Sequence, residues 1–180
     1  MLILILFLAC SFFVACFSKP LVSGEIFIVT RGAGNYKMGG VPIVAINENE
    51  FNDVFAKKGS EIKLLSDKIG QKETECAGKT RTSYLARLEY DICLSDAAKF
   101  RTEMNGLYTA ALPRPMATTT TDSDGKFKLA LPSSGKYIIF STASRAAGST
   151  TEAYLWIVPI DATGGEQSLS LSSNNLWEPN

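Results

Sequence analysis

The chain has 180 residues, of which 18 are basic and 18 acidic, so its formal net charge is zero. Nucleic-acid-binding surfaces are strongly basic, and this balance therefore argues against a nucleic-acid partner. The sequence contains no histidine, which removes the commonest general base and the commonest metal ligand. We therefore expect a protein that is not an enzyme and that uses no cofactor and no histidine-ligated metal.

The amino-terminal segment, residues 1–18, is typical of an export signal. Its first fifteen residues are almost all apolar. A helix of that length spans about 22 Å, which is short of the roughly 30 Å hydrocarbon core of a bilayer. A cleaved signal peptide therefore fits this segment better than a transmembrane anchor does.

A cysteine near the end of the signal is a candidate for lipidation. Residues 13–16 (FVAC) resemble the processing box of bacterial lipoproteins, in which Cys16 would become the lipidated first residue. The alternative is ordinary cleavage near Ser18, which would discard Cys16. We expect an exported protein that is periplasmic, tethered to a membrane by lipid, or secreted, and that meets a membrane only through such an anchor.

Two runs rich in β-branched and aromatic residues, 21–30 and 41–47, predict the first two strands. Between them, residues 31–40 contain four glycines and an asparagine, which favour a long hairpin loop. A phosphate-binding loop is the alternative for these glycines. Such a loop ends in Gly-Lys-Ser/Thr and leads into a helix, whereas a strand follows here. We therefore interpret residues 31–40 as a turn.

Residues 48–112 predict a helical hairpin inserted between strands. Of the 57 residues from 48 to 104, 21 are charged, against 36 in the whole chain. Two sets of apolar residues in this region recur at helical spacing. The first set is Phe51, Phe55, Ile62, Leu65 and Ile69, and the second is Leu85, Leu88, Ile92, Phe100 and Met104. The polar residues 75–82 would join the two helices. Gly59 favours a bend or break in the first helix. Residues 107–115 would end the helical region, because they contain two prolines.

This hairpin has two interpretations. It can be a solvated pair of helices packed on one face of a sheet. Alternatively it can be a protruding arm that recognises a protein partner, or self-associates, through the first apolar set. The partner-binding candidates are Phe51, Phe55, Ile62, Leu65 and Ile69.

Two cysteines, Cys76 and Cys93, lie in the predicted hairpin, and an exported compartment would allow them to pair. Two cysteines are too few for a structural zinc site. If the second helix begins near Ser83, Cys93 lies roughly 15 Å along it, whereas bridged Cα atoms must approach within about 7 Å. Either residues 77–86 fold back on themselves or the two cysteines are not bonded; we expect the disulfide.

The last third of the chain predicts the remaining strands. Residues 119–140 read as three strands, with turns at Asp124-Gly125 and at residues 133–135, and alternate residues of the middle strand are apolar. Two more strands follow at 151–160 and 167–171. With the first two, they predict a mainly β, seven-stranded sandwich built from residues 21–47 and 116–176.

Asp122 and Asp124 also resemble part of a calcium-binding EF-hand loop. If Asp122 is the first position of that loop, the fifth is Lys126; if Asp124 is the fifth, the first is Thr120 and the twelfth is Leu131, so both registers fail. An aspartate that caps its own backbone, followed by a glycine with positive φ, explains the pattern better. We therefore predict a structural turn rather than a metal site.

Three stretches, 24–30 (GEIFIVT), 121–132 (TDSDGKFKLALP) and 135–139 (GKYII), resemble the carboxypeptidase regulatory-like domain. That family has a transthyretin-like Greek-key β-sandwich and is a non-catalytic companion domain in carboxypeptidases. With residues 143–145, 152–156 and 171–176, the pattern is similar to exported bacterial proteins that carry a helical insertion between the second and third strands. Transthyretin-like hydrolases use histidines, so the resemblance does not imply that activity here.

The main functional hypothesis is therefore a non-enzymatic exported module that binds an envelope or extracellular protein through the helical insertion. The alternative is a carbohydrate-binding module that uses the aromatic residues Tyr154, Trp156 and Trp177. Tyr154 and Trp156 lie on one face of their strand, and packing in the core is favoured over a sugar-binding platform. Arg145 and Glu152 flank the predicted loop 146–151 and are expected to form a surface ion pair.

Overall fold

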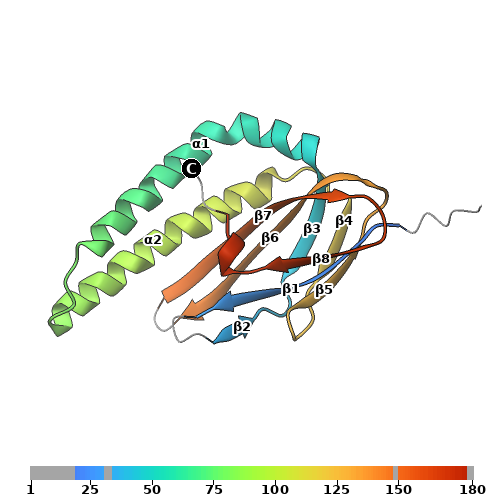
Figure 1. Ribbon diagram of the computed structural model, residues 1–180. Coiled ribbons are helices and arrows are strands. Elements are labelled where there is room, and N and C mark those ends of the chain that lie inside the picture. Colours follow the sequence, from blue (N-terminus) through green and yellow to red (C-terminus); the bar gives the residue numbers. More distant parts are fainter. Residues whose placement is uncertain (1–18, 31–33, 148–149, 178–180) are drawn as a thin grey trace, which may run out of the picture.

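Two four-stranded sheets and a pair of long helices form three stacked layers (Figure 1). They are seen in a computed structural model that describes residues 19–30, 34–147 and 150–177. One sheet forms the middle layer. The helices cover its outer face, and the other sheet packs against its inner face. The predicted signal segment 1–18, including Cys16, lies outside the described residues.

The first sheet is centred on β1 and the second on β3 and β6. The first contains β1 (Leu21–Val29), β2 (Asn35–Lys37), β5 (Lys126–Ala130) and β8 (Glu166–Leu171). The second contains β3 (Pro42–Asn47), β4 (Ala117–Thr120), β6 (Gly135–Ala147) and β7 (Thr150–Ala162). The helices are α1 (Glu48–Ala77) and α2 (Tyr84–Ala111), and a short 3-10 turn, η1 (Ser173–Asn175), follows β8.

Strand β1 joins the first sheet together. It pairs antiparallel with β5, parallel with β8, and at its far end antiparallel with β2. Gly24 lies opposite Leu169 in the parallel pair, and a Cβ atom at Gly24 would be 1.8 Å from the carbonyl oxygen of Leu169. Only glycine therefore allows β1 and β8 to approach this closely.

The predicted fold class was correct only in part. A two-sheet sandwich with an inserted helical hairpin is present, but 40% of the described residues are helical and 38% are in strands, so the protein is not mainly β. The described chain has eight strands rather than seven. The additional strand, β2, lies within the glycine-rich segment that we expected to be loop, because three of its residues pair with the end of β1.

Alternate residues of the strands fill the space between the two sheets. From the second sheet, Tyr137 and Ile139 on β6 and Trp156 on β7 point into this inner core. They meet the first sheet's Val22, Ile26, Phe127, Leu129 and Leu171. The inner core therefore has the alternating pattern of a β-sandwich.

The opposite face of the second sheet is also apolar. Ile138 and Phe140 on β6, and Leu155 on β7, form an outer core with side chains from both helices. The buried helical members are Phe51, Leu65, Ile69, Met104 and Tyr108. Strand β6 is thus buried on both faces, which explains its unbroken apolar run, and the base of the hairpin belongs to the core.

Capping residues set the helix boundaries. The side chain of Asn47 accepts a hydrogen bond from the backbone N–H of Asn49 at 3.0 Å, and Ser83 caps α2 in the same way. Helix α2 ends at Ala111, within the segment 107–115 that we predicted to end the helical region, and stops before Pro113 because proline cannot continue a helix. Helix α1 is unbroken at Gly59 and curves over the sheet (Figure 1).

Replacing a side chain of the outer core tests this arrangement. We expect Phe140→Ala to lower the free energy of unfolding by roughly 3 to 5 kcal/mol, because it leaves a cavity beneath the helices. Urea unfolding followed by tryptophan fluorescence measures the change. The control is Leu64→Ala, at an exposed position on α1, which should change the free energy by no more than about 0.5 kcal/mol. Equal effects of the two substitutions would contradict the three-layer description.

Candidate functional site

The end of the helical hairpin projects beyond the sheets (Figure 1). Ser95 and Ala98 of α2 line a surface hollow together with Thr151, which lies near the start of β7. The part of α2 that precedes Ser95 therefore extends past the end of this strand. We call residues 78–92 the hairpin tip. The start of β1 lies at the opposite end of the molecule (Figure 1).

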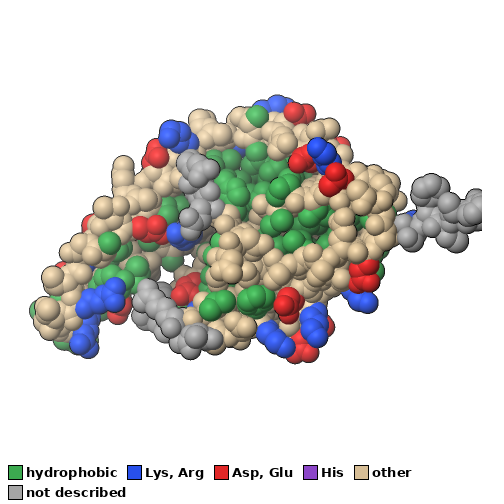
Figure 2. Space-filling model, in the orientation of Figure 1, with side chains coloured by type: hydrophobic (Ala, Val, Ile, Leu, Met, Phe, Trp, Pro, Cys, Tyr) green, Lys and Arg blue, Asp and Glu red, His purple; other side chains and the backbone are tan. Residues whose placement is uncertain are grey.

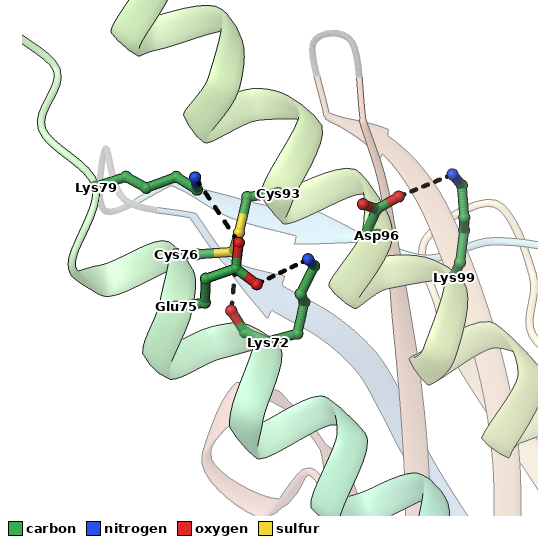
Figure 3. Close-up of polar contacts among 7 residues, drawn as sticks. All are labelled: Lys72, Glu75, Cys76, Lys79, Cys93, Asp96 and Lys99. Atoms are coloured by element: carbon green, nitrogen blue, oxygen red, sulfur yellow. Dashed lines mark hydrogen bonds and ion pairs between the residues drawn. A yellow bond between two sulfur atoms is a disulfide. The ribbon is translucent and has the colours of Figure 1, made fainter.

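A disulfide between Cys76 and Cys93 braces the hairpin where the tip begins (Figure 3). The sulfur atoms are 2.02 Å apart and the Cα atoms 5.6 Å apart. The sequence placed Cys93 roughly 15 Å along α2, which argued against a bond to Cys76. Residues 78–83 connect the helices and carry the chain past the end of α1 before α2 begins, which removes that difficulty. Six extended residues can span about 20 Å, enough for α2 to return and bring Cys93 level with Cys76.

Ion pairs surround the disulfide (Figure 3). The Lys72 Nζ atom lies 2.8 Å from a carboxylate oxygen of Glu75, and the Lys79 Nζ atom lies 3.7 Å from the other. The hydrogen bond with Lys72 holds the pKa of Glu75 below its usual value. Asp96 pairs with Lys99 at 2.9 Å, which lowers the pKa of Asp96 in the same way. Because these groups are at least partly exposed, the pairs contribute little to stability.

The first apolar set does not form a partner-binding surface. Phe51, Leu65 and Ile69 are buried against the second sheet. Phe55 and Ile62 are partly buried beside them, and the Phe55 ring stacks between two other rings. The prediction that these five residues bind a partner is therefore wrong, because their side chains are needed to cover the apolar face of the sheet.

The second apolar set divides into two groups. Met104 is buried, whereas Leu85, Leu88 and Ile92 are 68%, 46% and 54% exposed. Phe100 follows Ile92 by eight positions, a separation that rotates the helix by about 80° beyond two full turns, so the two groups lie on different faces. The buried face of α2 instead follows a regular spacing of four, three, four and four residues, which the sequence analysis missed. These residues are Cys93, Ala97, Phe100, Met104 and Tyr108.

Leu85, Leu88 and Ile92, which we call the tip stripe, form an exposed apolar row on the hairpin tip. Tyr84 beside them is 80% exposed. Figure 2 shows hydrophobic side chains next to basic ones at this projecting end. Single exposed apolar residues are common on protein surfaces, but a contiguous row on a projecting element is typical of an interaction site.

The three carbohydrate candidates do not form a platform. Tyr154 and Trp156 are buried in the inner core, as their strand position favoured, and the Trp156 Nε1–H donates to the carbonyl oxygen of Ser172 at 3.0 Å. Trp177 lies on the other side of the second sheet, where its ring meets Tyr108 edge-on at 4.9 Å. A sugar-binding site needs exposed aromatic faces side by side, and these residues provide none.

The Asp122 turn is structural, as predicted. One carboxylate oxygen of Asp122 accepts hydrogen bonds from the backbone N–H groups of Asp124 and Lys126, both at 2.9 Å. Gly125 has a φ of 74°, a conformation that favours glycine. Within the described residues, no group of three cysteine or acidic side chains could hold a metal ion. None of the described helices has a stretch long and apolar enough to span a bilayer.

Arg145 and Glu152 pair as expected, and Tyr154 joins them. The Arg145 Nε–H lies 2.7 Å from a Glu152 oxygen and 2.9 Å from the Tyr154 hydroxyl oxygen, and that hydroxyl donates to the same Glu152 oxygen. The Arg145 guanidinium also lies 5.3 Å from the ring centroid of Tyr36. Burial, and after it the hydrogen bond to Glu152, raises the pKa of Tyr154 to about 12. The cluster closes the end of the inner core.

Comparison with known proteins assigns no family. No family model matches the chain, and no curated protein sequence matches it. Among solved structures, the chain is similar to a "putative carbohydrate binding protein" from Pseudomonas aeruginosa, with 12% identity and a TM-score of 0.41. The match covers 86% of this chain and 88% of that protein. Similarity at this level says nothing about the function of the present chain.

Tyr154 makes stability depend on pH in the alkaline range. Its pKa rises from about 10 in the unfolded chain to about 12 in the folded protein. The folded protein therefore holds this proton more tightly, and stability should fall as pH rises from about 10 to about 12. In Tyr154→Phe the fall should be shallower, though not absent, because burial also raises the pKa of Tyr108. Urea unfolding at several pH values measures both slopes, and equal slopes would contradict the assignment.

Removing the disulfide should loosen the hairpin locally. The bond joins residues 17 apart in sequence, and a loop of that size contributes about 3 kcal/mol by restricting the unfolded chain. We expect the double variant Cys76→Ser/Cys93→Ser to exchange amide hydrogens faster around residues 70–95 than the parent does, with no change in β1, β3 and β6. Hydrogen exchange with mass spectrometry reads each segment separately. Faster exchange throughout both sheets would show that the disulfide supports the sandwich instead.

Proposed function

We propose that this chain is a non-enzymatic, exported interaction module that binds a protein of the cell envelope or extracellular space through the hairpin tip. The exposed tip stripe on a projecting, disulfide-braced pair of helices carries this proposal. The binding surface moves from the first helix, where the sequence placed it, to the start of the second. The reason is that the first apolar set of α1 packs against the sheet, whereas the tip stripe contacts no sheet.

We further propose that the sandwich is of the carboxypeptidase regulatory-like, transthyretin-like Greek-key type. The turn from Asp122 to Gly125 and the start of β6 at Gly135 support this, since they lie where the family motif expects a turn and a strand. The chain also crosses between the sheets four times, from β2 to β3, β4 to β5, β5 to β6 and β7 to β8. In that family the domain accompanies a catalytic partner without acting itself, which agrees with a binding role.

Export is supported by the apolar segment 1–18 and by the Cys76–Cys93 disulfide, since disulfides persist in oxidising compartments. A lipid at Cys16 would attach the molecule at the end opposite the hairpin tip. Such an arrangement would present the tip away from the membrane.

A site-specific photo-crosslinker tests the proposed surface. With the crosslinking residue in place of Leu88, irradiation of cells that make the full chain should give an adduct with a second protein. With the same residue in place of Leu64, which is 57% exposed on the opposite helix, we expect no adduct. Leu85→Ser and Ile92→Ser, added to the Leu88 crosslinker, should reduce the yield several-fold by removing apolar contacts.

Three outcomes would count against this proposal. Equal adducts from positions 88 and 64 would indicate contact without specificity, and an adduct from neither position would exclude a partner at the tip. An adduct of twice the chain's own mass would assign the tip stripe to self-association.

A further inference from the structure

We infer that the hairpin tip binds an amphipathic helix whose apolar stripe is flanked by lysine or arginine side chains. This inference rests on the proposed function and names the chemistry of the partner. It is drawn from the shape of the tip stripe and from the charged groups on its two sides.

The tip stripe has the dimensions of a helix-binding row. Leu85, Leu88 and Ile92 follow at spacings of three and four residues, so they lie on one face of α2. Seven residues of helix span about 10 Å, which is two turns. An opposing helix with apolar residues at positions i, i+3 or i+4, and i+7 presents a row of the same length.

Carboxylates flank the tip stripe on both sides. At about 100° per residue, Glu89 lies about 70° to one side of the centre of the stripe and Asp91 about 90° to the other. Both side chains are exposed, and neither forms an ion pair within the part of the chain that the structure describes. A partner that covers the tip stripe therefore brings its own flanking groups close to two carboxylates that are free to pair.

The basic residues of the hairpin tip are held by other contacts. The Arg81 guanidinium lies 3.8 Å from the ring centroid of Tyr90, which is on the far side of α2 from the tip stripe. The Arg87 Nε–H donates to the carbonyl oxygen of Arg81 at 3.2 Å. Lys79 pairs with Glu75. Arg81 and Arg87 keep their positive charge, but Arg81 precedes α2 and Arg87 lies about 130° around the helix from the centre of the tip stripe. The charged side chains nearest the tip stripe are therefore the carboxylates.

The carboxylates beside the tip stripe favour a basic helix over two other binding partners, an anionic lipid surface and a second copy of this chain. An anionic lipid surface on the tip stripe would place Glu89 and Asp91 against headgroups of the same sign. Pairing of α2 with α2 of a second copy would place the same carboxylates near their own counterparts, with no base of that face left to neutralise them. Like charges across an interface disfavour both arrangements, whereas lysine or arginine flanks favour binding.

Two synthetic helical peptides test the inference directly. They have equal length and the same leucine row, but one has lysines and the other glutamates on both flanks. In fluorescence anisotropy with the full, oxidised protein, the lysine peptide should bind about tenfold more tightly than the glutamate peptide. That preference should weaken as ionic strength rises from about 0.05 M to about 0.5 M. The double variant Glu89→Lys/Asp91→Lys should reverse it.

Matched variants separate the apolar from the charged contribution. Leu88→Ser should abolish binding of the lysine peptide, whereas Leu64→Ser should leave it unchanged. Equal binding of both peptides, lost in Leu88→Ser, would overturn the charge inference but leave the tip as a protein-binding surface. Binding of neither peptide, while the Leu88 crosslinker still captures a second protein, would also overturn the inference alone.

Separate experiments test the two other binding partners, a second copy of the chain and a lipid surface. Self-association that is detected by analytical ultracentrifugation and lost in Leu88→Ser would assign the tip stripe to a second copy. Flotation of the protein with vesicles rich in phosphatidylglycerol, again lost in Leu88→Ser, would assign it to a lipid surface. Either result would overturn the inference.

Discussion

The apolar outer face of the second sheet is the feature on which the rest of the structure depends. On β6, Ile139 points into the sandwich while Ile138 and Phe140 point outward. A sheet that is apolar on both faces needs a cover on each of them. The first sheet covers one face, and the bases of α1 and α2 cover the other. The base of the hairpin is therefore a third layer of the fold, and the tip extends beyond the sheets.

The same requirement explains why most of the aromatic residues are unavailable to a ligand. Tyr154 and Trp156 fill the inner core, while Phe55 and Trp177 close the junction between the helices and the sheet. The Trp177 backbone N–H also donates to the carbonyl oxygen of Leu155 at 2.8 Å, which fixes the end of the described chain to β7. Large apolar side chains in this protein mainly join layers, so the few left exposed on the tip are the more informative ones.

Local chemistry in the sequence predicted the strands, the Asp122 turn and the existence of both helices, because alternation, turn residues and helical spacing act over a few positions. It did not predict β2, whose three residues become a strand only by pairing with β1. Nor could spacing alone show which stripe of each helix would be buried. Phe51 and Leu85 both begin helical apolar sets, but only the former lies over a sheet. Which set is buried depends on which part of each helix lies over the sheet and which part extends beyond the ends of the strands.

The position of the disulfide has a mechanical consequence. The tip stripe belongs to α2, and α2 leads into β4, a four-residue strand at the edge of its sheet. Helix α1 instead continues from β3, which lies between β4 and β6. Without the disulfide, a pull on the tip would reach β4 directly through α2, but would reach α1 only through the six-residue connection 78–83. The covalent bond between Cys76 and Cys93 divides that tension between the two helices, so part of it reaches an interior strand that has hydrogen-bonded neighbours on both sides.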